Sequence, residues 1–140
     1  MVTVPKNYKP TEKEAYMNPV MIEYFRQKLN EWKASILNDA NNTLQELQDE
    51  GGLRESDVAD RASVETDVAL ELRARDRQRK LISKIDEALE RIRNSDYGYC
   101  EETGDPIGVK RLEARPVATL TVEAQERHER MERTHRDERE

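Results

Sequence analysis

The stretch GGLRESDVADRA, residues 51–62, separates two long segments that both have the periodicity of a helix. Before it, residues 19–50 place apolar side chains at steps of mostly three and four, at Ile22, Phe25, Leu29, Trp32, Ile36, Ala40, Thr43 or Leu44, and Leu47. After it, residues 57–94 repeat the spacing at Ala62, Ala69, Leu72, Ile82, Ile85, Leu89 and Ile92. Such steps form the narrow seam of a coiled coil, and Gly51-Gly52 lets the chain reverse. The sequence therefore predicts an antiparallel helical hairpin over residues 19–94 with its tip near residues 51–62.

The composition agrees with a thin packing of helices. Of the 140 residues, 35% are hydrophobic, 5% aromatic and 39% charged, which leaves too little apolar material for a thick globular core. The net charge of −6 argues against a protein held on DNA by phosphate contacts, so we expect a protein partner. Cys100 is the single cysteine, and no stretch resembles a signal peptide or a membrane span. We therefore expect a cytoplasmic protein.

Two further regions flank the hairpin. Residues 1–18 are expected to form an N-terminal arm with a short helix through Met17, because Thr11 and Glu14 have the spacing of a capping box. Asn18-Pro19 then reads as the N-cap and first residue of the long helix. Residues 95–140 are rich in turn formers, so short paired strands are predicted at 98–100 and 107–110. Thr121 is expected to cap a last helix that begins near Val122.

The hairpin tip carries two aspartates, Asp57 and Asp60, three residues apart at the start of the returning helix. One interpretation is capping, because acidic side chains in a first turn suit its free N–H groups and the positive end of the helix dipole. The other is that a carboxylate pair at the end of a long hairpin reaches into a recess and contacts a cation or basic groups. Catalysis is not expected, because an acid–base pair needs a cleft and shifted pKa values.

A basic run, residues 73–80, interrupts the apolar seam of the second helix. Arg75, Gln78 and Arg79 lie near the positions where the seam continues from Leu72 to Ile82, so part of the run is expected to lie along the partner helix. One interpretation of the run is a solvated helix surface with internal ion pairs, and another is a docking surface for an anionic partner. The two interpretations are compatible.

The spacing of Cys100, Thr103, Thr121 and Ala124 matches that of a four-cysteine zinc site. Threonine and alanine do not supply the donors that a structural zinc site needs, so we predict no metal. Packing is expected to replace it, with a core formed by Tyr97, Tyr99, Ile107, Val109, Leu112, Val117, Leu120 and Val122. Each such buried side chain contributes about 2 kcal/mol.

Five stretches of the chain resemble the DksA family of bacterial transcription factors. They are YMNP at 16–19, DVADRA at 57–62, ELRARDR at 71–77, YGYCE at 97–101 and IGVKRLEARP at 107–116. The resemblance covers nearly the whole chain after residue 10. It implies a mainly α protein, in which the antiparallel two-helix coiled-coil hairpin is joined to a small globular module with a degenerate, metal-free zinc-finger-like fold and a C-terminal helix.

The resemblance also implies a function. Proteins of this family bind RNA polymerase directly, without sequence-specific DNA binding, and insert the coiled coil into its secondary channel. With the alarmone ppGpp as co-regulator they destabilise open complexes, repress ribosomal RNA promoters and aid amino-acid biosynthesis promoters. We expect a monomer, because the seam is filled within the chain.

The resemblance assigns roles to particular positions. The tip determinants that act at the polymerase active centre fall on Asp57, Asp60 and Ala62. Support for polymerase binding falls on Arg77 and Arg111, and the ppGpp interface on Leu81, Lys84 and Arg115. The four zinc positions of the family are Cys100, Thr103, Thr121 and Ala124. A further basic contact of the family falls on Gln125, so the sequence leaves the strength of coupling to ppGpp open.

Two alternatives remain at this stage. In one, the chain is a coiled-coil adaptor whose tip and basic run are ordinary solvated surfaces. In the other, it is a channel factor that stimulates transcript cleavage, for which an acidic tip helps to place a magnesium ion. Arg61-Ala62 after the aspartates and the terminal module resemble DksA and not the cleavage factors.

Overall fold

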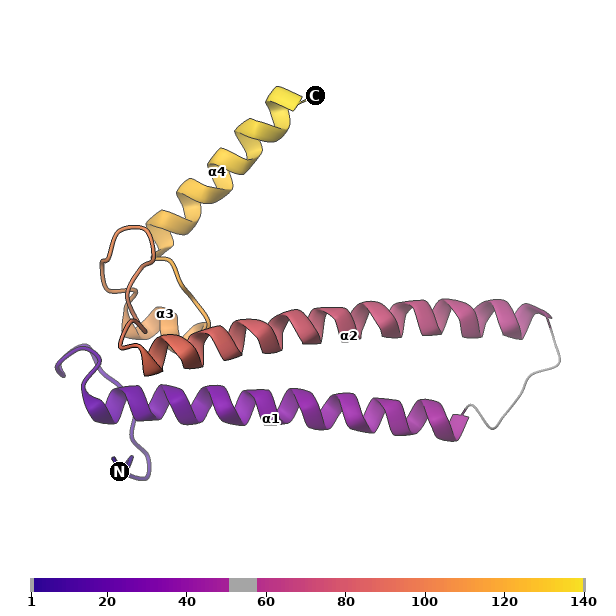
Figure 1. Ribbon diagram of the computed structural model, residues 1–140, viewed down its shortest axis with the longest axis horizontal. Coiled ribbons are helices and arrows are strands. Elements are labelled where there is room, and N and C mark those ends of the chain that lie inside the picture. Colours follow the sequence, from indigo (N-terminus) through magenta and orange to yellow (C-terminus); the bar gives the residue numbers. More distant parts are fainter. Residues whose placement is uncertain (1, 51–57, 140) are drawn as a thin grey trace. The chain divides into compact units, whose positions relative to one another are not determined.

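The part of the chain that the structure describes contains four helices, joined by turns and loops. The computed structural model describes the backbone of residues 2–50 and 58–139 and the side chains of residues 2–42 and 63–135. The helices are α1 (Pro19–Glu50), α2 (Val58–Arg93), α3 (Val109–Ala114) and α4 (Val122–Arg139) (Figure 1). The chain divides into two compact units, Met1–Leu29 with Glu87–Glu140, and Asn30–Asp86. The predicted mainly α fold is confirmed, and none of the described helices is long and apolar enough to cross a membrane.

The predicted caps are present at two helix starts. The Asn18 Oδ1 atom accepts a hydrogen bond from the Met21 N–H at 3.0 Å, with Pro19 as the first residue of α1. The Thr121 Oγ1 atom accepts from the Ala124 N–H at 3.2 Å at the start of α4. Each side-chain oxygen satisfies an N–H group that has no partner within its own helix. Short polar side chains therefore set where these helices begin.

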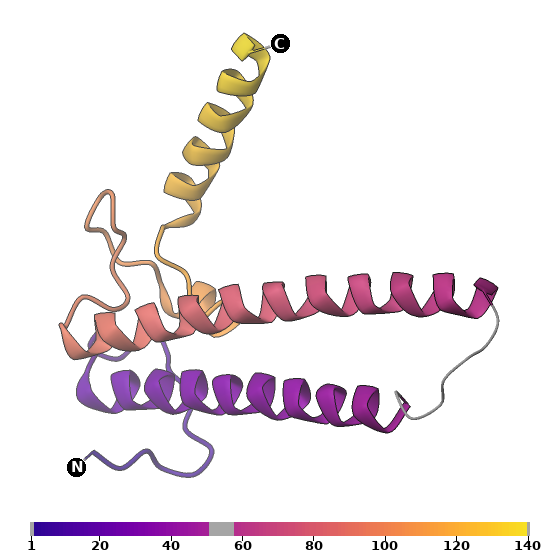
Figure 2. The same ribbon diagram turned by 45° about the vertical axis from the view of Figure 1, so that its right-hand side comes forward.

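In the unit Asn30–Asp86, α1 and α2 run antiparallel and lie side by side (Figures 1 and 2). Ile36 and Ile85 are buried, with exposed fractions of 8% and 0%. The Lys33 Nζ atom lies 2.6 Å from Asp86 Oδ1, which joins the two helices at the surface. The apolar seam is therefore formed here as the sequence predicts.

Farther along α2 the predicted seam is wrong. Ala69 and Leu72 are exposed, Leu72 by 58%. The partly shielded stripe instead runs through Glu71, Arg75 and Gln78, which continue the steps of three and four from Ile82. The Arg75 Nε and Glu71 Oε1 atoms lie 4.0 Å apart within this stripe. As expected, Arg75 and Gln78 lie along the seam, whereas Arg79 is exposed.

The other unit has a compact core. It is formed by Met21, Phe25 and Leu29 from α1, Ala88 from α2, and Tyr97, Cys100, Ile107, Val109, Leu112, Val117, Ala118 and Ala124 from the segment that follows. Of the predicted core residues, Tyr99 and Leu120 are only half-buried, and Val122 is 45% exposed. Val122 opens α4 and faces solvent, so the smaller Thr121 and Ala124 fill the core instead.

Two local predictions are corrected. Residues 11–17 form turns rather than a helix. The Thr11 N–H does donate to Glu14 Oε2 at 2.9 Å, but Met17 has a φ of 54°, a left-handed conformation that interrupts a helix. The strands predicted at 98–100 and 107–110 reduce to one antiparallel bridge between Tyr99 and Pro106, because α3 takes up the chain from Val109.

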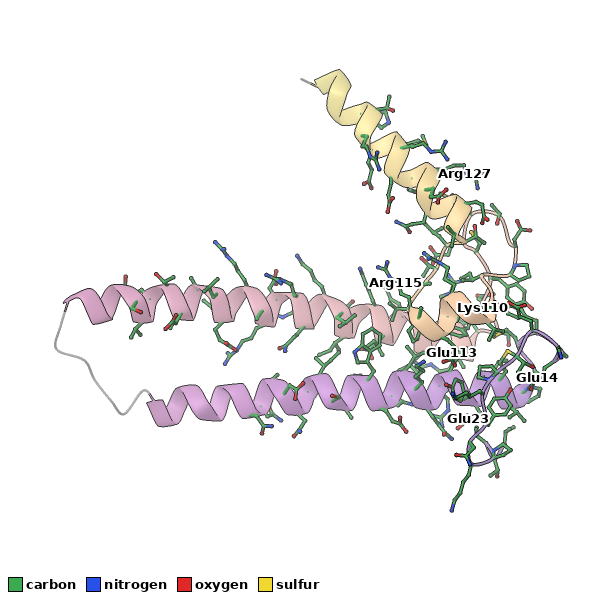
Figure 3. All side chains as sticks on the ribbon, turned by 180° about the vertical axis from the view of Figure 1, so that it is seen from behind. Glu14, Glu23, Lys110, Glu113, Arg115 and Arg127 are labelled. Atoms are coloured by element: carbon green, nitrogen blue, oxygen red, sulfur yellow. The ribbon has the colours of Figure 1, made fainter. Side chains whose placement is uncertain are left out.

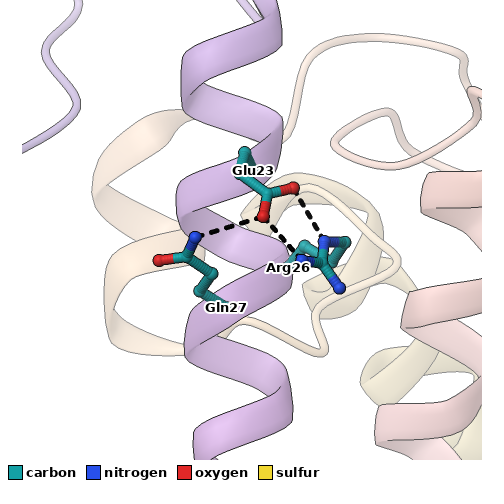
Figure 4. A network of polar contacts seen from close by, with 3 residues as sticks. All are labelled: Glu23, Arg26 and Gln27. Atoms are coloured by element: carbon teal, nitrogen blue, oxygen red, sulfur yellow. Dashed lines mark hydrogen bonds and ion pairs between the residues drawn. The ribbon is translucent and has the colours of Figure 1, made fainter. Parts of the chain in front are cut away.

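Surface contacts add little to the stability of α1. Figure 4 shows the carboxylate of Glu23 accepting hydrogen bonds from Arg26 Nε at 2.7 Å and from Gln27 Nε2 at 3.1 Å. The hydrogen bond from Arg26 lowers the pKa of Glu23. Pairs at this helical spacing contribute about 0.3 kcal/mol each. The fold therefore depends on the core and the caps.

Asn18→Ala removes the cap of α1 and is expected to lower the free energy of unfolding by about 1 kcal/mol. Urea unfolding followed by circular dichroism measures the change. Asn38→Ala is the matched control, because Asn38 is exposed inside α1 and alanine there favours the helix. Equal stability of Asn18→Ala and wild type would contradict the role of the cap.

Candidate functional site

The Tyr16 hydroxyl joins the N-terminal segment to two turns of the terminal module. It donates a hydrogen bond to the Gly98 carbonyl at 2.6 Å and accepts one from the Gly108 N–H at 3.0 Å. Burial raises the pKa of Tyr16, so the hydroxyl keeps its proton at neutral pH. The Tyr16 and Tyr99 rings also meet edge to face, with centroids 5.5 Å apart. One side chain thus connects residues that are 82 and 92 positions away in sequence.

Gly98 is required at this junction for two reasons. Its φ of 92° lies in the region that favours glycine, and a Cβ atom there would lie 2.9 Å from Met17 Sδ. The Gly98 carbonyl also accepts from the Ile107 N–H at 2.8 Å. The close approach of Met17 and the loop therefore depends on the absence of a side chain.

The side chains of Tyr97 and Arg91 form hydrogen bonds to other residues of the segment between α2 and α4. The buried Tyr97 hydroxyl donates to the Pro116 carbonyl at 2.8 Å, and burial raises its pKa. The Arg91 guanidinium donates to the Tyr99 carbonyl at 2.6 Å and to Glu101 Oε1 at 2.6 Å. The role of Arg91 was not predicted, since an arginine in the last turn of a helix has no sequence signal that separates it from surface charge.

Three of the four zinc positions come together in the structure. Cys100, Thr121 and Ala124 are buried, with exposed fractions of 4%, 8% and 0%, whereas Thr103 is exposed. The Thr121 hydroxyl lies 4.0 Å from Cys100 Sγ, and its oxygen caps α4. The Thr103 hydroxyl accepts from the Asp105 N–H at 3.2 Å.

These residues do not fit zinc. A structural zinc site takes four thiolate, imidazole or carboxylate donors, and only Cys100 offers one. Ala124 has no donor atom, and it fills the core at the fourth position. Among the described residues no group of three or more His, Cys, Asp or Glu side chains is placed to hold a metal ion. Packing and capping occupy the place of the metal.

The Cys100 thiol nevertheless retains an environment that suits a thiolate. Burial alone raises the pKa of a thiol, but hydrogen bonds from the Thr103 hydroxyl and from the N–H groups of Thr121, Thr103 and Glu102 outweigh it. Together they lower the pKa of Cys100 from 9.0 to about 7. The donors around the first zinc position are thus still arranged around a sulfur atom.

Helix α3 carries two basic residues, Lys110 and Arg111 (Figure 3). The Lys28 Nζ atom donates to the Glu113 carbonyl at 2.9 Å and lies 3.2 Å from its Oε2 atom, which fixes α3 against α1. The Arg111 Nε atom donates to the Leu120 carbonyl at 3.1 Å. Arg115 follows the helix and is exposed. Arg111 therefore supports the fold, whereas Arg115 is open to a partner.

The remaining predicted positions lie in the other unit or outside the described residues. Lys84 and Arg77 are exposed on α2, and Leu81 is half-buried one turn from each. Asp57 lies outside the described residues. Asp60 and Ala62 lie in the first turns of α2, where the structure describes the backbone alone. The structure thus brings together three of the four zinc positions, and it places Arg77, Leu81 and Lys84 along one stretch of α2.

Comparisons with known proteins give consistent matches along the chain. The family model described as "DnaK suppressor protein DksA, N-terminal domain" matches residues 21–92, and "Prokaryotic dksA/traR C4-type zinc finger" matches residues 95–130. A protein of Caulobacter vibrioides strain NA1000 / CB15N named RNA polymerase-binding transcription factor DksA is 63% identical over 94% of this chain and 92% of its own length. The Escherichia coli K12 protein of the same name is 41% identical over 83% of this chain and 76% of its own length.

A solved structure shares the architecture. Transcription factor DksA2 from Pseudomonas aeruginosa superimposes with a TM-score of 0.77 at 45% identity, over 85% of this chain and 91% of that one. The match to a four-cysteine zinc finger extends over a module that here keeps one cysteine. The fold of the module is therefore compatible with the replacement of three metal ligands.

Tyr16→Phe removes the hydroxyl that joins the Gly98 carbonyl to the Gly108 N–H. We expect the free energy of unfolding to fall by about 2 kcal/mol, because both groups lose a partner. Tyr99→Phe is the control, since the Tyr99 hydroxyl makes no hydrogen bond to any described residue. Urea unfolding measures both. A smaller loss for Tyr16→Phe than for Tyr99→Phe would contradict the assignment.

Proposed function

This chain belongs to the DksA family, and on that premise we propose that it binds RNA polymerase and regulates transcription without binding DNA by sequence. The observation that carries the proposal is its 63% identity, over 94% of the chain, with a protein named RNA polymerase-binding transcription factor DksA. The acidic net charge of −6 supports a protein partner over nucleic acid. The proposed factor acts in the cytoplasm and is not an enzyme.

The hairpin supplies the means of reaching the polymerase active centre. Its helices contain 32 and 36 residues, so at the rise of an α-helix the shorter one spans roughly 48 Å. A hairpin of that length suits entry into the secondary channel, with Asp57, Asp60 and Ala62 at the leading end. There the carboxylates act on the polymerase and shorten the lifetime of open complexes. Ribosomal RNA promoters are repressed, and some amino-acid biosynthesis promoters are aided.

The proposed co-regulator is ppGpp, bound at the interface with polymerase. Lys84 and Arg115 are exposed, and their cationic groups suit phosphate oxygens. Leu81 supplies an apolar contact on the same face of α2 as Lys84. Gln125 is half-buried, and its Nε2 atom lies 3.4 Å from Glu129 Oε1. A neutral side chain thus occupies a position where the family has a basic residue. We therefore expect weaker coupling to ppGpp than in members with a basic residue there.

The proposed role of the tip is tested by Asp60→Asn. The wild-type chain is expected to shorten the half-life of open complexes on a ribosomal RNA promoter, and further in the presence of ppGpp. The variant should bind polymerase with similar affinity yet leave the half-life unchanged, because it loses the tip carboxylate. Promoter-complex lifetime is measured by challenge with a competitor.

Asp67→Asn is the matched control, because Asp67 is an exposed aspartate two turns farther along α2. It should act like wild type. A wild-type chain that binds polymerase without changing open-complex lifetime would contradict the proposed regulation, and RNA cleavage would be the next assay. A chain that does not bind polymerase would contradict the proposal as a whole.

A further inference from the structure

A hollow lies between the N-terminal segment and α3. Its volume is about 440 Å³, and it is lined by Pro10, Thr11, Glu12, Lys13, Val109 and Lys110. Pro10 and Val109 are buried and form an apolar floor. All the lining residues belong to one compact unit. The hollow is large enough for an amino-acid side chain.

Two lysines on the rim of this hollow are left without acidic partners. Lys13 and Lys110 are exposed, and neither forms an ion pair or side-chain hydrogen bond with a described residue. Two basic groups of the same unit are paired, Arg26 with Glu23 and Lys28 with Glu113, whereas Lys6 and Lys9 are exposed like the rim lysines but lie outside the lining. Glu12 is the one acidic residue in the lining.

One of the two acidic side chains next to Lys13 in sequence, that of Glu14, is occupied elsewhere. Glu14 accepts hydrogen bonds from the Tyr8 hydroxyl at 2.8 Å and from the Thr11 N–H at 2.9 Å. These bonds fold the N-terminal segment back on itself and lower the pKa of Glu14. The two sides of the hollow are thus fixed, one by Glu14 and the other by the anchoring of α3 through Lys28. A fixed site loses little freedom on binding.

We propose that this hollow docks an acidic segment of RNA polymerase, with carboxylates at Lys13 and Lys110 and an apolar side chain over Pro10 and Val109. The inference rests on the proposed function and adds a contact surface that is separate from the hairpin tip. The two lysines favour a segment with acidic side chains, and the apolar floor determines which residue of that segment lies in the hollow. Such rim charges act mainly on the rate of association and its dependence on salt.

The test compares two double charge reversals in the full-length chain. The first variant, Lys13→Glu with Lys110→Glu, reverses the two charges on the rim. The control, Lys6→Glu with Lys9→Glu, changes the net charge by the same amount at two lysines of the N-terminal arm that lie outside the lining. Surface-immobilised core polymerase reports affinity and association rate at low and moderate salt. We expect the rim variant to bind about tenfold more weakly, with a smaller salt dependence, and the control to stay near wild type. Thermal unfolding should be unchanged, since all four lysines are exposed.

A photo-crosslinking residue in place of Glu12 identifies what the hollow contacts. Glu12 is exposed and lines the hollow, so the bound segment should be captured and read by mass spectrometry. An acidic polymerase peptide would support the inference. A neutral or basic peptide would overturn it.

The outcomes separate this inference from the function on which it rests. Equal binding by wild type and the rim variant would overturn the docking surface while the proposed function stands. Equal weakening by both double variants would overturn it too, because binding would then follow net charge alone. Failure of the wild type to bind polymerase would overturn the proposed function and the inference together.

Discussion

The Tyr16 hydroxyl donates to the Gly98 carbonyl and accepts from the Gly108 N–H, and so it holds together the two ends of the turn-rich loop. The rest of the module follows from this junction. Gly108 immediately precedes α3, so the position of α3 and its basic residues depends on where the loop closes. Met17, next to Tyr16, fills the space that a side chain at position 98 would take. Tyr16 and Met17, which the sequence placed in a short helix, therefore tie the N-terminal segment to the terminal module.

The module illustrates how packing can replace metal ligands. In a four-cysteine site the metal fixes two turns to each other. Here the same positions contribute a thiol, a helix cap and a buried methyl group, at Cys100, Thr121 and Ala124. The Tyr97 hydroxyl and the Arg91 guanidinium also donate hydrogen bonds to the carbonyls of Pro116 and Tyr99. Because these contacts lie close together in one small core, their contributions to the stability are expected to be coupled.

The sequence predicted the helices more reliably than the contacts between them. Asn18 and Thr121 identified two helix starts, because capping depends on neighbouring residues alone. The prediction of a short helix at 11–17 was wrong, because the hydrogen bond between Thr11 and Glu14 that caps a helix also forms in a single turn. The seam includes Arg75 and Gln78, as predicted, but it continues to Glu71 and not to the apolar Leu72, which is exposed. The bridge made by Tyr16 joins residues far apart in the chain, and periodicity carries no signal for it.

The central claim is that this module is held by its own side chains and hydrogen bonds. Amide hydrogen exchange tests it most directly, at the N–H groups of Cys100, Ile107 and Gly108, which are bonded to Asp105, Gly98 and Tyr16. The exchange is measured with and without a high-affinity zinc chelator. We predict the same protection in both conditions, because no bond in the network runs through a metal. Loss of protection at these three amides in the chelator would contradict the account.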